Sequence, residues 1–107
     1  MLHLTAKNFE TEVKQSPLPA IVMFHAVWCG KCAMMMPVVE ELEEKYEDQY
    51  KFCDVEIEES AVLAAEYEAD IVPTFVLFKD GIMQAELKGM MSKSSFEQAI
   101  KEIFRNS

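Results

Sequence analysis

Two apolar runs, residues 20–24 and residues 74–78 with Thr74 at its start, divide the chain, and each lies beside turn-forming residues. Short continuous apolar runs of this kind are typical of strands that are buried on both faces of a sheet. Residues 2–4 and the alternating segment 51–56 have the weaker pattern of shorter or half-buried strands. The pattern therefore predicts two central strands and two further strands.

Between these strands, apolar residues recur at spacings of three and four, as in a helix with one buried face. Thr5 and Ser60 are expected to cap the first and third predicted helices, because a hydroxyl there accepts a hydrogen bond from a free backbone N–H. The predicted helices and their apolar residues are 5–15 with Phe9 and Val13; 32–46 with Met35, Val39, Leu42 and Tyr46; 60–67 with Val62, Leu63 and Tyr67; and 92–105 with Phe96, Ile100, Ile103 and Phe104.

Lys79-Asp80-Gly81 predicts a tight hairpin turn, since Asp-Gly supplies the positive φ angles that such turns require. Residues 82–87 then return as the partner strand of the second apolar run. The resulting order, β-α-β-α-β-α-β-β-α, predicts an α/β fold with a central mixed β-sheet and helices on both faces. Residues 1–107 contain no internal repeat or linker, so we expect a single domain.

The chain is acidic, with nineteen Asp and Glu against ten Lys and Arg and a net charge of -9. Binding to nucleic acid or to an anionic membrane surface depends on positive charge, so we expect neither partner. Thirteen of the acidic residues lie between Glu40 and Asp70. We interpret this segment as solvated helix faces, and an acidic flank that steers basic partners is the alternative.

Three cysteines are too few, and odd in number, for the framework of a disulfide-stapled secreted domain. Residues 1–8 lack the basic and apolar regions of a secretory signal. The apolar stretch 20–27 is interrupted by His25 and is too short to span a membrane. We therefore expect the protein in the cytoplasm.

Trp28-Cys29-Gly30-Lys31-Cys32 lies where the first apolar run leads into a predicted helix. The thiolate is the reactive form of cysteine, and free N–H groups at a helix N-terminus stabilise negative charge. Two intervening residues let one helical turn bring both sulfurs within bonding reach, and Gly30 keeps the first sulfur accessible. A Cys-x-x-Cys beside strand-helix-strand patterning is typical of a redox motif.

With this motif in place, the chain resembles the thioredoxin family over nearly its whole length. The resemblance implies the thioredoxin fold, with a kink in the active-site helix at Pro37 and a cis proline, Pro73, that faces the disulfide. It rests on several separated features, which are residues 28–32, Pro37, Val72-Pro73-Thr74, Lys79-Asp80-Gly81 and Lys88-Gly89.

The resemblance also implies a protein thiol-disulfide oxidoreductase, a protein-disulfide reductase in electron transport and cell redox homeostasis. Cys29 is then the nucleophile that attacks a client disulfide, and Cys32 resolves the mixed disulfide and closes a Cys29–Cys32 disulfide. A donor such as a thioredoxin reductase restores the dithiol, and we expect a monomer without a cofactor. The client chain is expected to pair like a strand in a shallow groove of Trp28, Val72, Pro73, Gly89 and Met90.

Three positions depart from the family's pattern: Lys31 stands for a usual proline, Met23 for a buried aspartate and His25 for a common tryptophan. An ammonium near Cys29 and the loss of a buried carboxylate both favour the thiolate, so we expect a reduction potential slightly less negative than that of thioredoxin. A thioether accepts no proton, so resolution by Cys32 is expected to be slow unless water, Lys31 or His25 assists. For His25, a packed strand histidine is the preferred interpretation.

Cys53 lies in the apolar phase of a strand and is interpreted as a buried, inert thiol, with a regulatory or dimer-forming role as the alternative. Three consecutive methionines, residues 34–36, point in different directions around a helix, and no histidine or second cysteine pair completes a zinc site. We therefore expect no metal site. A thioredoxin-fold scaffold module and metal handling through Cys29 and Cys32 are the alternative functions.

Overall fold

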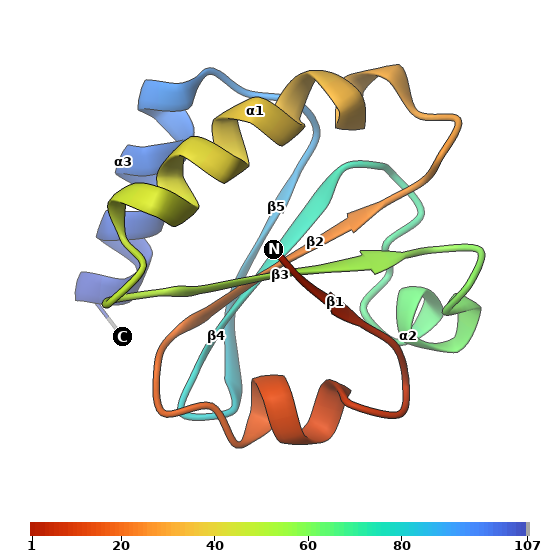
Figure 1. The fold of residues 1–107 in the computed structure, drawn as a ribbon, viewed down its shortest axis with the longest axis horizontal. Helices are drawn as coiled ribbons and strands as arrows, with labels where there is room; N and C mark the ends of the chain where they lie inside the picture. Colours follow the sequence, from red (N-terminus) through yellow and green to blue (C-terminus); the bar gives the residue numbers. More distant parts are fainter. Residues whose placement is uncertain (107) are drawn as a thin grey trace.

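The computed structural model describes residues 1–106 and contains a five-stranded mixed sheet (Figure 1). Its strands are β1 (Leu2–Leu4), β2 (Ala20–His25), β3 (Lys51–Glu56), β4 (Thr74–Lys79) and β5 (Ile82–Lys88), in the spatial order β1-β3-β2-β4-β5. β3 runs parallel to both β1 and β2, and β4 runs antiparallel to β2 and β5. The carboxyl ends of β1, β2 and β3 therefore meet at one edge of the sheet.

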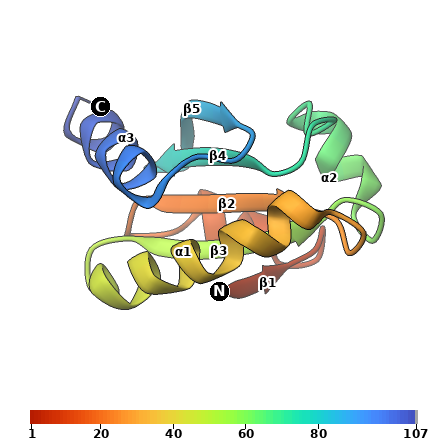
Figure 2. The ribbon, with the colours of Figure 1, turned by 90° about the horizontal axis from the view of Figure 1, so that it is seen from above.

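Helices cover both faces of this sheet (Figure 2). α1 (Gly30–Lys45) and α3 (Lys93–Arg105) pack on one face, and α2 (Ala61–Glu66) and the π-helix η1 (Glu10–Lys14) pack on the other. The predicted α/β architecture, with helices on both faces, is confirmed. Within residues 1–106 no helix is long and apolar enough to cross a membrane.

The central strand β2 contributes to two separate cores. Ile21 and Met23 belong to the cluster beneath α1 and α3, whereas Val22 and Phe24 belong to the cluster with η1 and α2. All four side chains are 0–1% exposed. Full burial of a large apolar side chain contributes about 1.5–3 kcal/mol. The apolar run is continuous because both of its faces are buried, as predicted.

The first helical segment differs from the prediction. A regular helix from Thr5 to Gln15 is absent, and the π-helix η1 has Phe9 rather than Thr5 at its N-cap position. Its defining bond runs from the Gln15 N–H to the Glu10 carbonyl. The Thr5 hydroxyl accepts a hydrogen bond from the Lys7 N–H over 3.2 Å, as predicted for a cap, and the Thr5 N–H donates to the side chain of Asn8 over 2.8 Å. The turn that follows continues into η1 rather than into a regular α-helix. The two apolar residues on which the prediction rested are nevertheless buried.

Two details of the helix predicted over residues 60–67 are wrong. Ser60 occupies the N-cap position of α2, but its side chain makes no capping hydrogen bond. Val62 is 79% exposed, whereas Leu63 and Tyr67 pack against the core as predicted. α2 has only six residues, so only a narrow face of it contacts the core. Leu63 lies on that face, and Val62 lies outside it.

Asp80 and Gly81 form the predicted tight turn between β4 and β5, with φ angles of 54° and 77°. Gly81 also lies against η1, where a Cβ atom would collide with the carbonyl oxygen of Lys14. The turn therefore requires glycine for both its backbone conformation and its close approach to η1.

Candidate active site

Cys29 lies at the N-terminal end of α1, directly after the short loop that follows β2 (Figure 1). It is the N-cap residue, with φ -91° and ψ 107°, and its Sγ accepts a hydrogen bond from the backbone N–H of Cys32 over 3.1 Å. The N–H groups of a first helical turn stabilise negative charge, and the first turn of α1 contains no acidic residue. A thiolate on Cys29 is therefore favoured by its position.

Cys29 and Cys32 form a disulfide across this turn, with their Cα atoms 5.3 Å apart. Cys32 is 2% exposed and belongs to the core cluster beneath α1, whereas Cys29 is only half-buried. Gly30 and Lys31, which lie between them, are exposed. An incoming disulfide can therefore reach the Cys29 sulfur more readily than that of Cys32.

The segment before β4 lies beside the cysteine pair. Val72 and Pro73 are joined by a cis peptide bond, and the Val72 carbonyl oxygen is 3.7 Å from the Cys29 Sγ. The Gly89 N–H, directly after β5, donates to the Pro73 carbonyl over 2.8 Å, with Gly89 at a φ of 91°. The structure thus brings Val72, Pro73 and Gly89 together beside Cys29.

Exposed apolar side chains flank this arrangement. Trp28 is 64% exposed and Met90 is 48% exposed, each next in the chain to a residue of the site. Val27 and Ile71 are also exposed, and the sequence analysis missed both because their short segments carry no periodic pattern. Apolar side chains that gather at the surface mark an interaction site.

Beneath the cysteines, Met23 is fully buried in the cluster that contains Cys32. It lies opposite Asp54 of β3 in the sheet, and the Asp54 Oδ2 is 2.7 Å from His25 Nε2 and 3.0 Å from His3 Nδ1. Burial alone raises the pKa of Asp54, but the hydrogen bonds from His25 and His3 outweigh burial and lower it. The sequence analysis identified Met23 and His25 and missed Asp54, because only strand register places it beside them.

Cys53 lies on the opposite face of the sheet from the cysteine pair, in the cluster with η1 and α2. It is free, fully buried, and its burial raises the pKa of the thiol to about 12. The predicted burial of Cys53 is confirmed, and its position separates it from the chemistry of Cys29 and Cys32.

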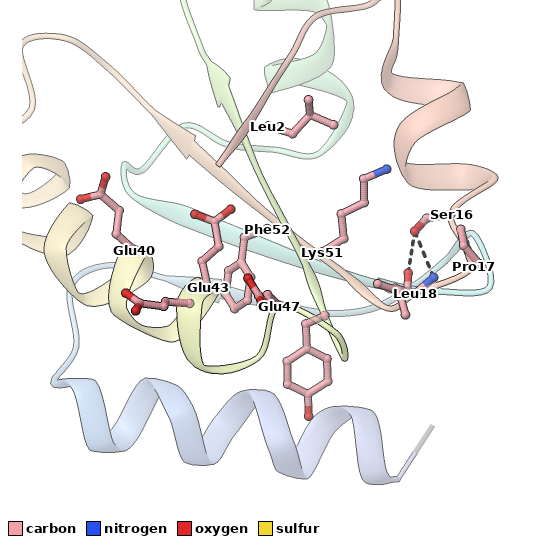
Figure 3. Close-up of a pocket in the computed structure, with 11 residues that line it drawn as sticks. Leu2, Ser16, Pro17, Leu18, Glu40, Glu43, Glu47, Lys51 and Phe52 are labelled. Atoms are coloured by element: carbon pink, nitrogen blue, oxygen red, sulfur yellow. Dashed lines mark hydrogen bonds between the residues drawn. The ribbon is translucent and has the colours of Figure 1, made fainter.

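A cavity of about 660 Å³ lies near the other edge of the sheet, between the loop before β2, the start of β3 and the end of α1 (Figure 3). No cysteine or histidine lines it, so it offers no nucleophile for disulfide exchange. Within residues 1–106 no group of three or more His, Cys, Asp or Glu side chains is arranged to hold a metal. The acidic residues that line the cavity are Glu40, Glu43, Glu44 and Glu47.

Residues 1–102 match the family model described as Thioredoxin. The chain is 35% identical to Thioredoxin 1 of Synechococcus elongatus over 97 residues, which cover 91% of each chain. It is 36% identical to the thioredoxin of Rickettsia typhi over 93 residues, covering 87% of this chain and 89% of the relative. It is 35% identical to the thioredoxin of Pseudomonas aeruginosa over 94 residues, covering 88% and 87%. With the cysteine pair at the start of α1, these matches show that the chain belongs to the thioredoxin family and is a thiol-disulfide oxidoreductase with protein-disulfide reductase activity.

Proposed function

We propose that Cys29 attacks the client disulfide and that Cys32 resolves the mixed disulfide. The observation that carries this assignment is the unequal exposure of the two sulfur-bearing residues. Cys29 is half-buried at a helix N-terminus, whereas Cys32 is 2% exposed. A reactive cysteine needs both access and a neighbourhood that stabilises its thiolate, and Cys29 has both.

Client reduction proceeds in two thiol-disulfide exchanges. The Cys29 thiolate attacks one client sulfur, which forms a Cys29–client bond, breaks the client disulfide and releases one client thiolate. Cys32 then loses its proton and attacks the Cys29 Sγ, which releases the second client thiolate and closes the Cys29–Cys32 disulfide. The client gains two electrons and the cysteine pair loses two. A dithiol donor such as a thioredoxin reductase returns them.

The client chain binds along the segment Val72–Pro73 and Gly89, in an extended form. This assignment is supported by the 3.7 Å approach of the Val72 carbonyl to the Cys29 Sγ and by the exposed apolar side chains of Trp28 and Met90 on either side. Main-chain hydrogen bonds depend little on the client's side chains. We therefore expect clients to have an accessible disulfide in common rather than a sequence motif.

Lys31, Met23, Trp28 and Gly30 adjust the reactivity of the pair rather than exchange electrons. Lys31 places an exposed ammonium in the first turn of α1, and Met23 keeps the region beneath Cys32 apolar. The ammonium attracts a thiolate on Cys29, and the uncharged Met23 places no carboxylate there to repel it, so both residues favour the reduced form of the pair.

The same proposal has the single domain of residues 1–107 working as a monomer in the cytoplasm. A net charge of -9 opposes the association of two copies. The buried free thiol of Cys53 is consistent with a protein that works beside a dithiol donor.

Trapping the intermediate tests the roles of the two cysteines. The Cys32→Ser variant, mixed with a disulfide-containing protein, is expected to accumulate a mixed disulfide on Cys29 that intact mass measurement detects. The Cys29→Ser variant is expected to form none, and Cys53→Ser, the matched control, is expected to behave as the wild type. Equal trapping by Cys29→Ser and Cys32→Ser would overturn the assignment.

A redox titration tests the assignment of Cys29 and Cys32 as the redox couple. Equilibration in dithiothreitol or glutathione buffers, acid quenching, unfolding and alkylation count the free thiols at each potential. The oxidoreductase loses two alkylation sites together while Cys53 stays labelled, at a potential slightly above about −270 mV. A titration without a paired transition would contradict the assignment of Cys29 and Cys32 as the redox couple.

A further inference from the structure

Four titratable side chains form one connected cluster at the edge of the sheet that carries the cysteines. Asp54 Oδ2 on β3 is 2.7 Å from His25 Nε2 on β2 and 3.0 Å from His3 Nδ1 on β1. The second ring nitrogen of His3, Nε2, is 2.6 Å from the Oε1 of Glu59 in the loop before α2. The His25 and Asp54 side chains are only 14% and 13% exposed.

The geometry fixes where the protons lie in this cluster. An ionised carboxylate only accepts hydrogen bonds, so every nitrogen that faces one carries a hydrogen. Both ring nitrogens of His3 face carboxylates, which makes His3 an imidazolium, and the hydrogen bonds to Asp54 and Glu59 raise its pKa. His25 presents Nε2 to Asp54, which fixes a hydrogen on Nε2 and leaves Nδ1 as the nitrogen that can accept a proton.

The His25–Asp54 pair lies on the same face of the sheet as the buried cysteine. Met23 and Phe52, two positions before His25 and Asp54 on their strands, both belong to the cluster that contains Cys32. Side chains two apart on a strand share a face. α1 begins at Gly30, five residues after His25, and lies over β2 and β3 on this face (Figure 2). The pair therefore lies at the end of the sheet where the first turn of α1 carries Cys32.

Resolution of a mixed disulfide requires a proton acceptor here. Cys32 reacts only as a thiolate, yet its 2% exposure and apolar neighbours such as Met23 disfavour the charged form. Met23 itself has no group that accepts a proton. Imidazole is the side chain that changes charge nearest neutral pH, and Asp54 holds His25 in the tautomer whose Nδ1 can accept.

We propose that His25, oriented by Asp54, accepts the Cys32 proton during resolution, an inference that rests on the proposed roles of Cys29 and Cys32. The Cys32 S–H bond breaks as the proton moves to Nδ1 of His25, and the thiolate attacks the Cys29 Sγ. The Cys29–client bond breaks, and the released client thiolate takes up a proton from solvent. His25 is partly exposed and returns its proton to solvent, so the ring is neutral again for the next client. Asp54 is a positioning residue in this scheme.

The charged groups near His25 come from several elements, and each enters the pH dependence. Glu56 is the register partner of His25, and its carboxylate is occupied by the backbone N–H groups of the following loop. The imidazolium of His3 lies beyond Asp54 and offsets its charge. The His25 ring contacts Asp54 and has Glu56 as its register partner on β3, and through Asp54 it is connected to His3 from β1 and Glu59 from the loop before α2. Lys31 is the charged residue in the first turn of α1, the helix that follows β2.

The reaction of the reduced protein with the aromatic disulfide 5,5′-dithiobis(2-nitrobenzoate) separates the two exchanges. Attack by Cys29 releases the first thionitrobenzoate and leaves a mixed disulfide, and attack by Cys32 releases the second. We expect His25→Gln to slow the second phase by about tenfold or more at neutral pH and to change its pH profile, with the first phase unchanged. His3→Gln, the matched control that keeps the His25–Asp54 bond, is expected to stay within about twofold of the wild type.

Asp54→Asn gives an independent variant, because it removes the carboxylate without altering the imidazole. It is expected to slow the second phase less than His25→Gln and to shift its pH profile. A second phase in His25→Gln that matches the wild type in rate and pH profile would overturn the proposal, and an unchanged Asp54→Asn would overturn the positioning role. Absence of two phases in the wild type would instead contradict the roles of Cys29 and Cys32.

Discussion

The Cys29 Sγ accepts a hydrogen bond from the backbone N–H of Cys32, so the more accessible cysteine caps the helix that carries its partner. A cap that bears negative charge is stronger than a neutral one, because the hydrogen bond becomes charge-assisted. Reduction therefore leaves a helix terminus already arranged to hold a thiolate. Lys31, exposed in the same turn, adds a positive charge without a carboxylate to offset it in that turn.

The Lys31→Gln variant is expected to have a more negative reduction potential. Removing the ammonium disfavours the Cys29 thiolate, so the reduced form loses stability relative to the disulfide. A loss of about 0.7 kcal/mol corresponds to about 15 mV for this two-electron couple. Equilibration with glutathione measures the shift, with Lys101→Gln on the exposed side of α3 as control. A shift to a less negative potential contradicts the argument.

The positions of the cysteines could be predicted from sequence because the signals are local. An apolar run, a Cys-x-x-Cys and a helical stripe that begins at Met35 place Cys29 at a helix N-terminus without any knowledge of the rest of the fold. The observed β2 begins at the predicted residue and extends one residue further, and α1 begins two residues earlier and ends one residue earlier than predicted. The buried face of a short helix was predicted less accurately, because the six-residue α2 exposes Val62, which was expected to face the core.

Cys53 is expected to resist alkylation in the folded protein. Its pKa of about 12 means that almost none of it is thiolate near neutral pH, and its side chain is fully buried. Iodoacetamide added to the reduced native protein is expected to modify Cys29 and leave Cys53 unmodified, as peptide mass mapping reports. In denaturant Cys53 becomes labelled, which serves as the control. Rapid native labelling of Cys53 would support a regulatory role.

His3 is expected to make folding stability depend on pH. Its folded-state pKa is raised above 6.5 by hydrogen bonds to Asp54 and Glu59, so protonation favours the folded chain. The contribution is complete below the unfolded pKa and disappears as the pH rises through the folded pKa. Because His3 is half exposed, we expect at most about 1 kcal/mol.

Denaturant unfolding of the wild type and of His3→Gln measures this contribution. The difference in unfolding free energy between the two proteins is expected to be largest near about pH 6 and to vanish near about pH 9. Glu59→Gln removes one of the two carboxylate charges beside His3 and is expected to give a smaller version of the same trend. A difference that grows with pH contradicts the assignment of His3 as an imidazolium.

The cluster around His3 shows what the sequence cannot reveal by itself. His3, His25, Asp54 and Glu59 are separated by up to 56 residues, and none stands in a recognisable motif. Their contacts follow from the pairing of β3 with both β1 and β2, and from the register that sets Asp54 opposite His3 and Met23. Local pattern predicts strands but not strand register, so the cluster appears only once the sheet is assembled.

Met23→Asp introduces a proton acceptor into the cluster that contains Cys32 and tests whether this speeds resolution. A carboxyl group in this apolar cluster has its pKa raised by burial, which makes it a base of useful strength near neutral pH. The second phase of the aromatic disulfide reaction is expected to become faster. The free energy of unfolding is expected to fall by about 2 kcal/mol or more, because burial removes the hydration of the carboxyl group. An unchanged resolution rate at neutral pH would show that proton removal from Cys32 does not limit resolution.

Three glycines allow backbone strain and steric collision to be measured separately. At Gly81 a Cβ atom meets the Lys14 carbonyl, and φ is 77°. At Gly89 φ is 91° with no atom within 4 Å of the added Cβ, and at Gly30 that space is also open without a positive φ. Gly30→Ala is therefore expected to change the unfolding free energy by less than about 0.5 kcal/mol, and Gly89→Ala to lower it by about 1–2 kcal/mol. Gly81→Ala adds the displacement of η1 and is expected to cost about 3 kcal/mol or more. Denaturant unfolding of the three variants gives this order, and equal losses at Gly81 and Gly89 would show that η1 moves aside without cost.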